Sequence, residues 1–255
     1  MVSAYRVGLV VPSSNTTMET ELPALLRSRE RSAPGERFTF HSARARMRRV
    51  TPDELAGMNA EVERASAQLA DAAPDVVATA CLVAIMSQGR GYHRTAEADI
   101  ARVLEQERAP APVVSSAGAL IAALSALGAR RIAMVTPYVA SLTCLVADYI
   151  EDAGIVVQDS VSLEVSDNRE VAALDPGDLP RHVRTLDLDG CDALVLSACV
   201  QMPSLPVLEQ VEQEVELPVL SAATATAWAV LTALGVEPSV PGGGELLRGR
   251  ITAAR

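Results

Sequence analysis

Two cysteines stand at matching places in a sequence that repeats itself. Cys81 ends the apolar run of PDVVATACLV (74–83), and Cys199 ends that of CDALVLSACVQ (191–201). A thiol at the carboxyl end of a buried strand, where a helix opens, lies near free backbone N–H groups that favour the thiolate. One such cysteine is commonly only a packing residue. Two at equivalent positions predict a pair of thiols that act as nucleophile or proton carriers on two faces of a substrate.

The other two cysteines and the histidines give weaker signals. Cys144 lies on the apolar face of SLTCLVADYI and Cys191 stands at the start of a strand, so we expect both to be packing residues. No pair forms CxxC, which indicates reduced thiols in a cytoplasmic protein. No histidine is spaced with another histidine or a carboxylate like a metal pair, so no metal site is predicted. His93, twelve residues after Cys81, is a minor candidate for thiol activation.

Three further polar side chains follow strands in the same way. Asn15 lies in VPSSNTT after the first strand, Tyr138 occupies the matching turn of the second half, and Asn168 follows a strand over 156–165. Such residues are commonly helix caps or turn residues. A capped helix also directs backbone N–H groups at the strand ends, where they bind anions. The pattern therefore predicts an anion-binding edge, whichever of the two roles each side chain has.

Strands alternate with helices along the chain, which predicts an α/β fold with parallel sheets. RRIAMVTPYVASLTCLVADYIEDAG (130–154) parallels the segment from residue 5, and PVLSAATATAWAVLTALG (218–235) parallels PVVSSAGALIAALSALG (112–128). We therefore expect two pseudo-symmetric subdomains, each a mostly parallel sheet flanked by helices. The first is expected to comprise residues 1–117 plus 222–255, and the second 118–221. Ligands bind outside the carboxyl ends of parallel strands, so the site is predicted at the interface of the subdomains.

Composition narrows the class of partner. The 255 residues carry a formal net charge of −10, and every one of the 22 basic residues is Arg. The negative charge argues against nucleic acid and anionic membranes as partners, and the lack of Lys excludes Schiff-base and P-loop chemistry. The longest apolar run, 76–86, is far shorter than the ~20 residues of a transmembrane helix. The Arg-rich segment 27–49 is interpreted as a solvated face, and VPGGGE (240–245) as part of a loosely packed tail.

At VGLVVPSSNTTMETELP, ACLVAIMSQG and SACVQMPSL the chain resembles maleate cis–trans isomerases, within the Asp/Glu racemase superfamily. The resemblance covers nearly the whole chain. It implies that the Cys81 thiolate adds to an alkene carbon of maleate, giving a succinyl-cysteine, and that Cys199 delivers and removes a proton. It also implies a small dicarboxylate substrate, no metal or cofactor, and a homodimer. The residues that match the family's carboxylate binders are Asn15, Tyr138 and Asn168, with backbone groups at Leu82, Val83, Val200 and Gln201.

No Arg falls within these motif segments, so we expect neutral donors to hold both carboxylates of the substrate. Two other classes remain open. A racemase or decarboxylase of the same superfamily would act on a small acid, although the decarboxylases resemble this layout with only the second cysteine. A non-catalytic binding protein with two α/β lobes around a cleft is the alternative outside enzymes.

Overall fold

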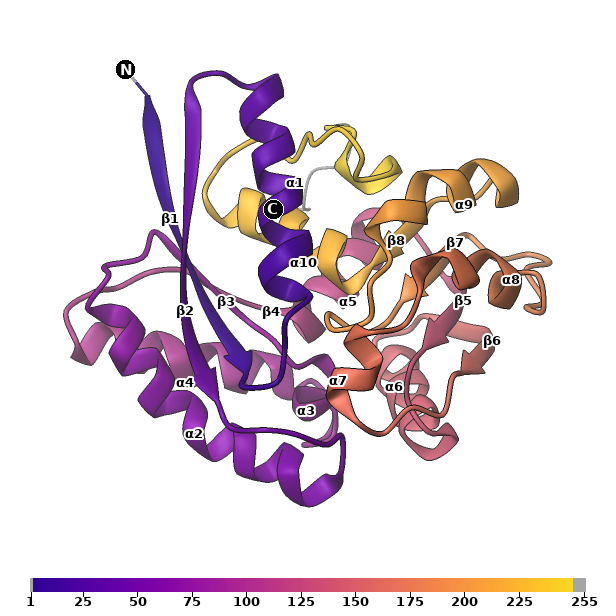
Figure 1. Ribbon diagram of the computed structural model, residues 1–255, viewed down its shortest axis with the longest axis horizontal. Helices are drawn as coiled ribbons and strands as arrows, with labels where there is room; N and C mark the ends of the chain where they lie inside the picture. Colours follow the sequence, from indigo (N-terminus) through magenta and orange to yellow (C-terminus); the bar gives the residue numbers. More distant parts are fainter. Residues whose placement is uncertain (1, 250–255) are drawn as a thin grey trace.

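The computed structural model describes residues 2–249, which form two four-stranded sheets with helices packed on them (Figure 1). The first sheet has the order β2-β1-β3-β4 and the second β6-β5-β7-β8, and all paired strands are parallel. The strands are β1 (Ser3–Pro12), β2 (Glu36–Ala45), β3 (Val76–Thr79), β4 (Val113–Ser115), β5 (Arg131–Thr136), β6 (Val156–Ser162), β7 (Ala193–Ser197) and β8 (Val219–Ser221). The predicted α/β class and its duplication are confirmed, since the two orders are the same.

Helices connect the strands as the alternation predicts. They are α1 (Met18–Ser32), α2 (Pro52–Ala70), α3 (Leu82–Met86), α4 (Tyr92–Gln106), α5 (Ser116–Ala126), α6 (Ala140–Asp152), α7 (Asn168–Ala172), α8 (Leu179–Val183), α9 (Leu208–Val215) and α10 (Ala222–Ala233). Helix α4 begins at Tyr92, because Gly91 adopts a left-handed φ of +63° that turns the chain into the helix. None of the helices among the described residues is long and apolar enough to cross a membrane.

The central strands are buried on both faces. In β3 and β7 every residue is buried, because helices cover both sides of a parallel sheet and leave no solvent-facing side. These strands therefore read as continuous apolar runs rather than as alternating ones. Their carboxyl ends are followed within two residues by Cys81 and Cys199. The sequence pattern that marks the core thus also brings the two thiols to the ends of the central strands.

Helices α5 and α10 pack against each other in the middle of the molecule (Figure 1). Nine of the 12 residues of α10 are buried, as expected for a helix that is apolar all round. Both helices start in the same way: the Ser115 hydroxyl accepts the N–H of Gly118, and the Ser221 hydroxyl accepts that of Thr224. The subdomain boundaries at 117/118 and 221/222 stay a prediction, and their parts at residue 1 and 250–255 lie outside the described residues.

Two packing predictions are wrong. The segment around 240–247 is not loose, because Val240, Leu246 and Leu247 are at most 3% exposed and pack against the core. Cys144 is exposed rather than packed. Helix α6 turns Thr143, Val146 and Ile150 toward the interior, and Cys144 lies outside that stripe. Cys191 is buried, as predicted.

Candidate active site

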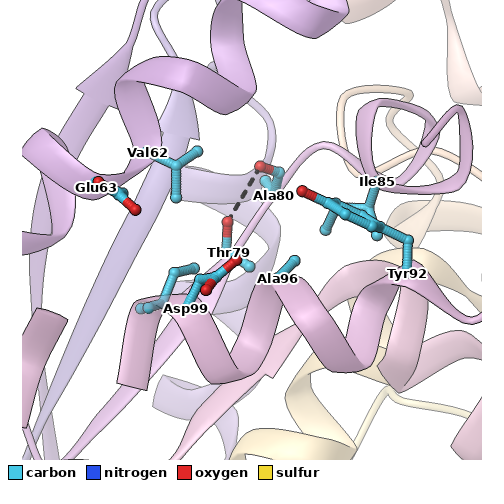
Figure 2. Close-up of a pocket in the computed structure, with 9 residues that line it drawn as sticks. Val62, Glu63, Thr79, Ala80, Ile85, Tyr92, Ala96 and Asp99 are labelled. Atoms are coloured by element: carbon cyan, nitrogen blue, oxygen red, sulfur yellow. Dashed lines mark hydrogen bonds between the residues drawn. The ribbon is translucent and has the colours of Figure 1, made fainter. Parts of the chain in front are cut away.

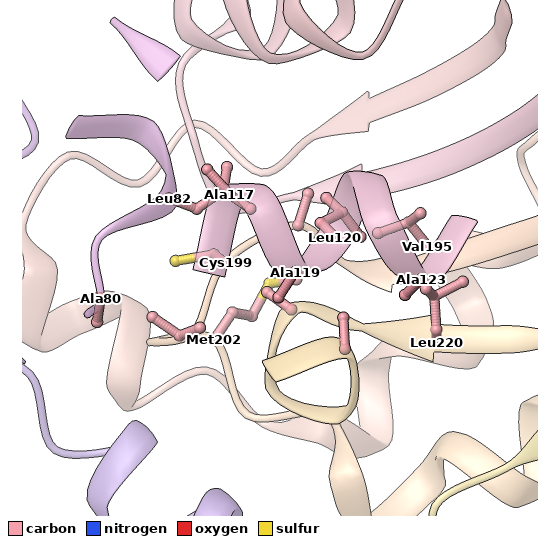
Figure 3. Packing of buried hydrophobic residues seen from close by; sticks show 14 of the residues in the cluster. Ala80, Leu82, Ala117, Ala119, Leu120, Ala123, Val195, Cys199, Met202 and Leu220 are labelled. Carbon is pink, nitrogen blue, oxygen red and sulfur yellow. The ribbon is translucent and has the colours of Figure 1, made fainter. Parts of the chain in front are cut away.

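Cys81 and Cys199 lie together in the interior. Each residue is 7% exposed, and both belong to one continuous apolar cluster. They lie close enough for negative charge on Cys199 to raise the pKa of Cys81. Figure 3 shows the Cys199 sulfur directed toward the segment that carries Ala80 and Leu82, on either side of Cys81. The fold therefore brings the two thiols into one site, as the repeat predicts.

Burial decides the protonation of Cys81. Desolvation by burial and, to a smaller extent, the nearby Cys199 raise the pKa of the thiol from 9.0 to about 12, although the N–H groups of Ala84 and Val83 bond the sulfur and lower it. Cys81 is the N-cap of α3, so these are first-turn N–H groups, as expected. The expectation that they leave the thiolate favoured overall is wrong, because desolvation outweighs them. Cys81 is accordingly a thiol here.

Cys199 has a more polar environment. Burial raises the pKa of its thiol, while bonds from the Tyr138 hydroxyl and from the N–H groups of Gln201 and Met202 lower it. The Gln201 N–H lies 3.4 Å from the sulfur. Tyr138 is 2% exposed, and burial raises its pKa well above the usual value. Its single hydroxyl proton is shared between the Cys199 sulfur and the Ala198 carbonyl, which lies 3.3 Å from the hydroxyl. The phenol is therefore a neutral donor beside both thiols.

The Gln201 side chain joins the two halves. Its Oε1 accepts the N–H groups of Thr16 (2.9 Å) and Thr17 (3.2 Å), and its Nε2 donates to the carbonyls of Ser14 (3.0 Å) and Asn168 (2.8 Å). Two acceptor and two donor bonds use the full capacity of a primary amide. The backbone N–H of Gln201 donates to the Cys199 sulfur. Gln201 therefore fixes the loops around the site and has no side-chain capacity left for a ligand.

We call the Gln201 side chain with its four hydrogen bonds the Gln201 clamp. Asn15 and Asn168 are both nearly fully buried beside it. The Asn15 Oδ1 accepts the N–H of Met18 at 3.0 Å, so Asn15 caps the start of α1. The Asn15 Nδ2 has no acceptor among residues 2–249. The Asn168 Nδ2 donates to the Ser14 hydroxyl at 2.9 Å. Asn168 itself is not a cap, because the Asp167 side chain caps α7.

Further donors are backbone N–H groups. In the described part of the chain, those of Leu82 and Val200 have no acceptor, whereas those of Val83 and Gln201 are directed at the sulfurs. Together with the Asn15 Nδ2, they are neutral groups that can bind carboxylate oxygens.

Residues 47–50 cover one edge of the site. The Met47 carbonyl accepts the hydroxyls of Ser13 and Ser14, the Arg48 carbonyl accepts the Asn168 N–H at 3.3 Å, and the Val50 N–H donates to the Ser166 carbonyl at 3.1 Å. The segment thus bridges the turn after β1 and the turn before α7. A surface hollow of about 810 Å³ opens over this edge, lined by Ser13, Ser14, Arg48, Arg49, Glu54, Asp167 and Arg169.

Other candidates lie elsewhere. The His93 Nδ1 is 2.5 Å from the Tyr149 hydroxyl, and burial lowers the pKa of the imidazole, so its partner is Tyr149 rather than Cys81. A cavity of about 270 Å³ beside Thr79 and Ala80 contains no predicted site residue (Figure 2). The described residues contain no group of three or more His, Cys, Asp or Glu that could hold a metal.

Sequence reasoning missed two residues of this region. For Gln201, only a role of the backbone was expected and not one of the side chain. Glu21 was not singled out. The Glu21 Oε1 accepts the N–H groups of Ser204 and Leu205, both at 2.7 Å, across the two halves. The signal was present in METELP, where an acidic residue occupies the apolar face of α1, since Glu21 is buried with Leu22 and Leu25.

Known proteins show the same architecture over nearly the full length. A family model described as arylmalonate decarboxylase matches residues 7–247. The maleate isomerase of Alcaligenes faecalis is 51% identical over 248 residues, which cover 97% of this chain and 98% of that protein. The maleate isomerase Iso of Pseudomonas putida S16, solved as a cysteine-to-alanine variant with maleate, is 54% identical with a TM-score of 0.96 over 98% of this chain and 99% of that one. A cysteine-to-serine variant of the Nocardia farcinica maleate cis–trans isomerase, solved with a covalently bound succinylcysteine intermediate, is 49% identical with a TM-score of 0.93 over 96% and 99%.

Proposed function

The chain belongs to the maleate isomerases of the arylmalonate decarboxylase family, and from this membership we propose that it converts maleate to fumarate through a succinyl-cysteine on Cys81. The observation that carries the assignment of residues is the pairing of Cys81 and Cys199, two thiols from equivalent strand ends that are buried so close together that charge on Cys199 raises the pKa of Cys81. The reaction needs a group on the alkene and a proton carrier beside it, and this pair supplies both.

The chemistry balances with these two residues. The cycle starts after the Cys81 thiol has released its proton to solvent, which its raised pKa makes the minor form of the unliganded site. The Cys81 thiolate forms a C–S bond to one alkene carbon, and the π electrons move to the other carbon and its carboxylate. The Cys199 thiol protonates that carbon, which gives the succinyl-cysteine and a Cys199 thiolate. The former double bond is now a single bond and rotates. Cys199 then removes a proton from the same carbon, the double bond re-forms, the C–S bond breaks, and fumarate and the Cys81 thiolate are released.

Neutral donors are proposed to bind the two carboxylates. The Nδ2 of Asn15 and the N–H groups of Leu82 and Val200 have no acceptor among the described residues, and the Tyr138 hydroxyl lies beside both thiols. Asn168 completes the set from the second half, and we retain the N–H groups of Val83 and Gln201 as partners of the charge that develops on the sulfurs. Preorganised neutral donors stabilise the charge on the adduct and leave one carboxylate free to swing.

The test is mass spectrometry of a Cys199→Ser variant mixed with maleate. We expect a peptide containing Cys81 that has gained one maleic acid, because the adduct forms there and its breakdown is slowed. The Cys81→Ser variant is the matched control and should gain nothing. Wild-type turnover of maleate by Cys81→Ala would contradict the role of Cys81 as nucleophile, and wild-type turnover by Cys199→Ala that of Cys199 as proton carrier.

A racemase or decarboxylase activity on a small acid is the second candidate. A decarboxylase of this family with one cysteine would not need Cys81, so the burial of Cys81 beside Cys199 favours the isomerase. Incubation with maleate alone, followed by detection of fumarate, separates these possibilities. Release of CO₂ from a substituted malonate, with no fumarate from maleate, would favour the decarboxylase.

Three further properties are part of the proposal. The reaction needs no cofactor, because the two thiols supply both the nucleophile and the proton. The enzyme works in the cytoplasm, in line with four cysteines that form no disulfide. It acts as a homodimer. The lack of a cofactor is tested by activity after exhaustive dialysis against a chelator. The need for reduced thiols is tested by loss of activity on thiol oxidation, and the dimer by sedimentation equilibrium.

A further inference from the structure

Six exposed arginines surround the turn after β1. They come from the end of β2, from residues 46–49, from α2 and from α7: Arg44, Arg46, Arg48, Arg49, Arg64 and Arg169. They line two adjoining surface hollows that share Ser13 and Arg48. Buried Ala43, Ala45 and Met47 alternate with the first three, so the strand pattern directs these guanidinium groups outward. We call these six residues the arginine rim.

Most of the rim is not neutralised by ion pairs. Arg44 pairs with Glu19 and Arg169 with Asp167, but no carboxylate among the described residues lies within ion-pair distance of the guanidinium groups of Arg46, Arg48, Arg49 and Arg64. Glu54 and Glu61 also line the hollows, where they accept backbone N–H groups. Six arginines against these four carboxylates leave a net charge of +2 in a chain of net charge −10.

The rim lies over the edge of the site. The carbonyls of Ser13 and Asn15 accept Arg44, and the Arg48 carbonyl accepts the Asn168 N–H. Ser14, on the floor of the larger hollow, accepts the Asn168 amide. The positive surface therefore ends where the buried neutral donors begin.

We propose that the arginine rim recruits dicarboxylate dianions to the edge formed by Ser14 and Asn168 and raises kcat/KM without touching the reacting atoms. This inference rests on the proposed function for its substrate. Neutral donors bind a dianion well only after it has lost its hydration, whereas a positive surface attracts it from solution. The rim also explains how an acidic protein admits a doubly negative substrate.

The size of the effect follows from Coulomb's law. Removing two positive charges about 10 Å from a dianion in water is expected to lower kcat/KM about 5- to 10-fold at roughly 0.01 M ionic strength, where the Debye length is about 30 Å. At about 1 M the Debye length falls to about 3 Å, and the difference should vanish. The turnover number at saturation should not change.

The test compares Arg46→Gln/Arg64→Gln with a matched control, Arg27→Gln/Arg31→Gln. Arg27 and Arg31 are exposed on α1, beyond the rim, and the control removes the same charge. Maleate isomerisation is measured for both and for wild type at the two ionic strengths. We expect the rim variant alone to lose kcat/KM at low salt and to equal wild type at high salt. The same salt dependence in all three proteins would overturn the proposal.

A second readout does not depend on the isomerase reaction. Alkylation by anionic iodoacetate and by neutral iodoacetamide is followed on the peptide that contains Cys81, apart from the exposed Cys144. The ratio of the two rates at low salt reports attraction of the anion. The rim variant should lower this ratio about 2- to 3-fold, and the control should not. If wild type makes no fumarate, the proposed function fails and the ratio alone decides on the rim. An unchanged ratio then refutes the rim.

Discussion

Glu21 is a buried carboxylate that ties α1 to the loop carrying Cys199 and Gln201. Its Oε1 accepts two backbone N–H groups at 2.7 Å, from Ser204 and Leu205. Its Oε2 is buried with no hydrogen-bond partner within the described structure. Burial raises the pKa of this carboxyl above 4.5, although the two N–H groups lower it. We predict a large loss of stability when Ala replaces Glu21 and little change when Gln replaces it.

The magnitudes follow from these contacts. Glu21→Ala leaves two buried N–H groups without an acceptor, at about 1–3 kcal/mol each, so the free energy of unfolding should fall by about 2–5 kcal/mol. Glu21→Gln keeps an acceptor oxygen at the same place and removes a charge that burial disfavours. It should therefore lie within about 1 kcal/mol of wild type, since charge-assisted bonds are exchanged for neutral ones without desolvating an ion.

The pH dependence has a definite sign. Below pH 4.5 the carboxyl is protonated in both the folded and the unfolded states. Because the folded pKa is raised, stability is lost as the pH rises from 4.5 through the folded value, where the buried group must ionise. Glu21→Gln has no such loss. Its stability relative to wild type should therefore increase from acid toward neutral pH and then stay constant.

Urea unfolding of the three proteins at one protein concentration, between about pH 4.5 and 8, measures these differences. Glu105→Gln serves as the control, because Glu105 is exposed on α4. With a slope near 2–3 kcal/mol per molar urea, Glu21→Ala should lower the midpoint by about 1–2 M. The reasoning is refuted if Glu21→Ala is as stable as wild type, or if the relative stability of Glu21→Gln falls as the pH rises.

Three further predictions concern the thiols and the clamp. Cys144 is exposed and the other three cysteines are buried, so titration with Ellman's reagent at neutral pH should show one fast thiol per chain, absent in Cys144→Ser. The rate of Cys81 alkylation by iodoacetamide, measured by peptide mass spectrometry, should still rise with pH beyond pH 10, because the pKa of Cys81 is raised to about 12. A rate that reaches a plateau below pH 9 would contradict this. Gln201→Leu removes four hydrogen bonds, three of them between the halves, and should lower kcat at least tenfold, with Gln210→Leu, on exposed α9 surface, as the control.

Local patterns were enough to predict the fold and the two cysteines. Continuous apolar runs identified β3 and β7, because a parallel strand covered on both faces has no polar side. The duplication then placed Cys81 and Cys199 at equivalent strand ends, and the strand order is equivalent in the two sheets. Nothing beyond spacing and residue type was needed for this step.

Long-range packing decided the rest. The Gln201 amide bonds residues 33 to 187 positions away, and Glu21 bonds a loop more than 180 positions away, so neither role has a local signature. The exposure of Cys144 and the burial of Leu246 depend on which helix face meets the core. For Cys81, the sequence indicated the N–H groups that lower the pKa of the thiol. Desolvation outweighs these groups, and it depends on every atom around the sulfur, so only the tertiary structure determines it.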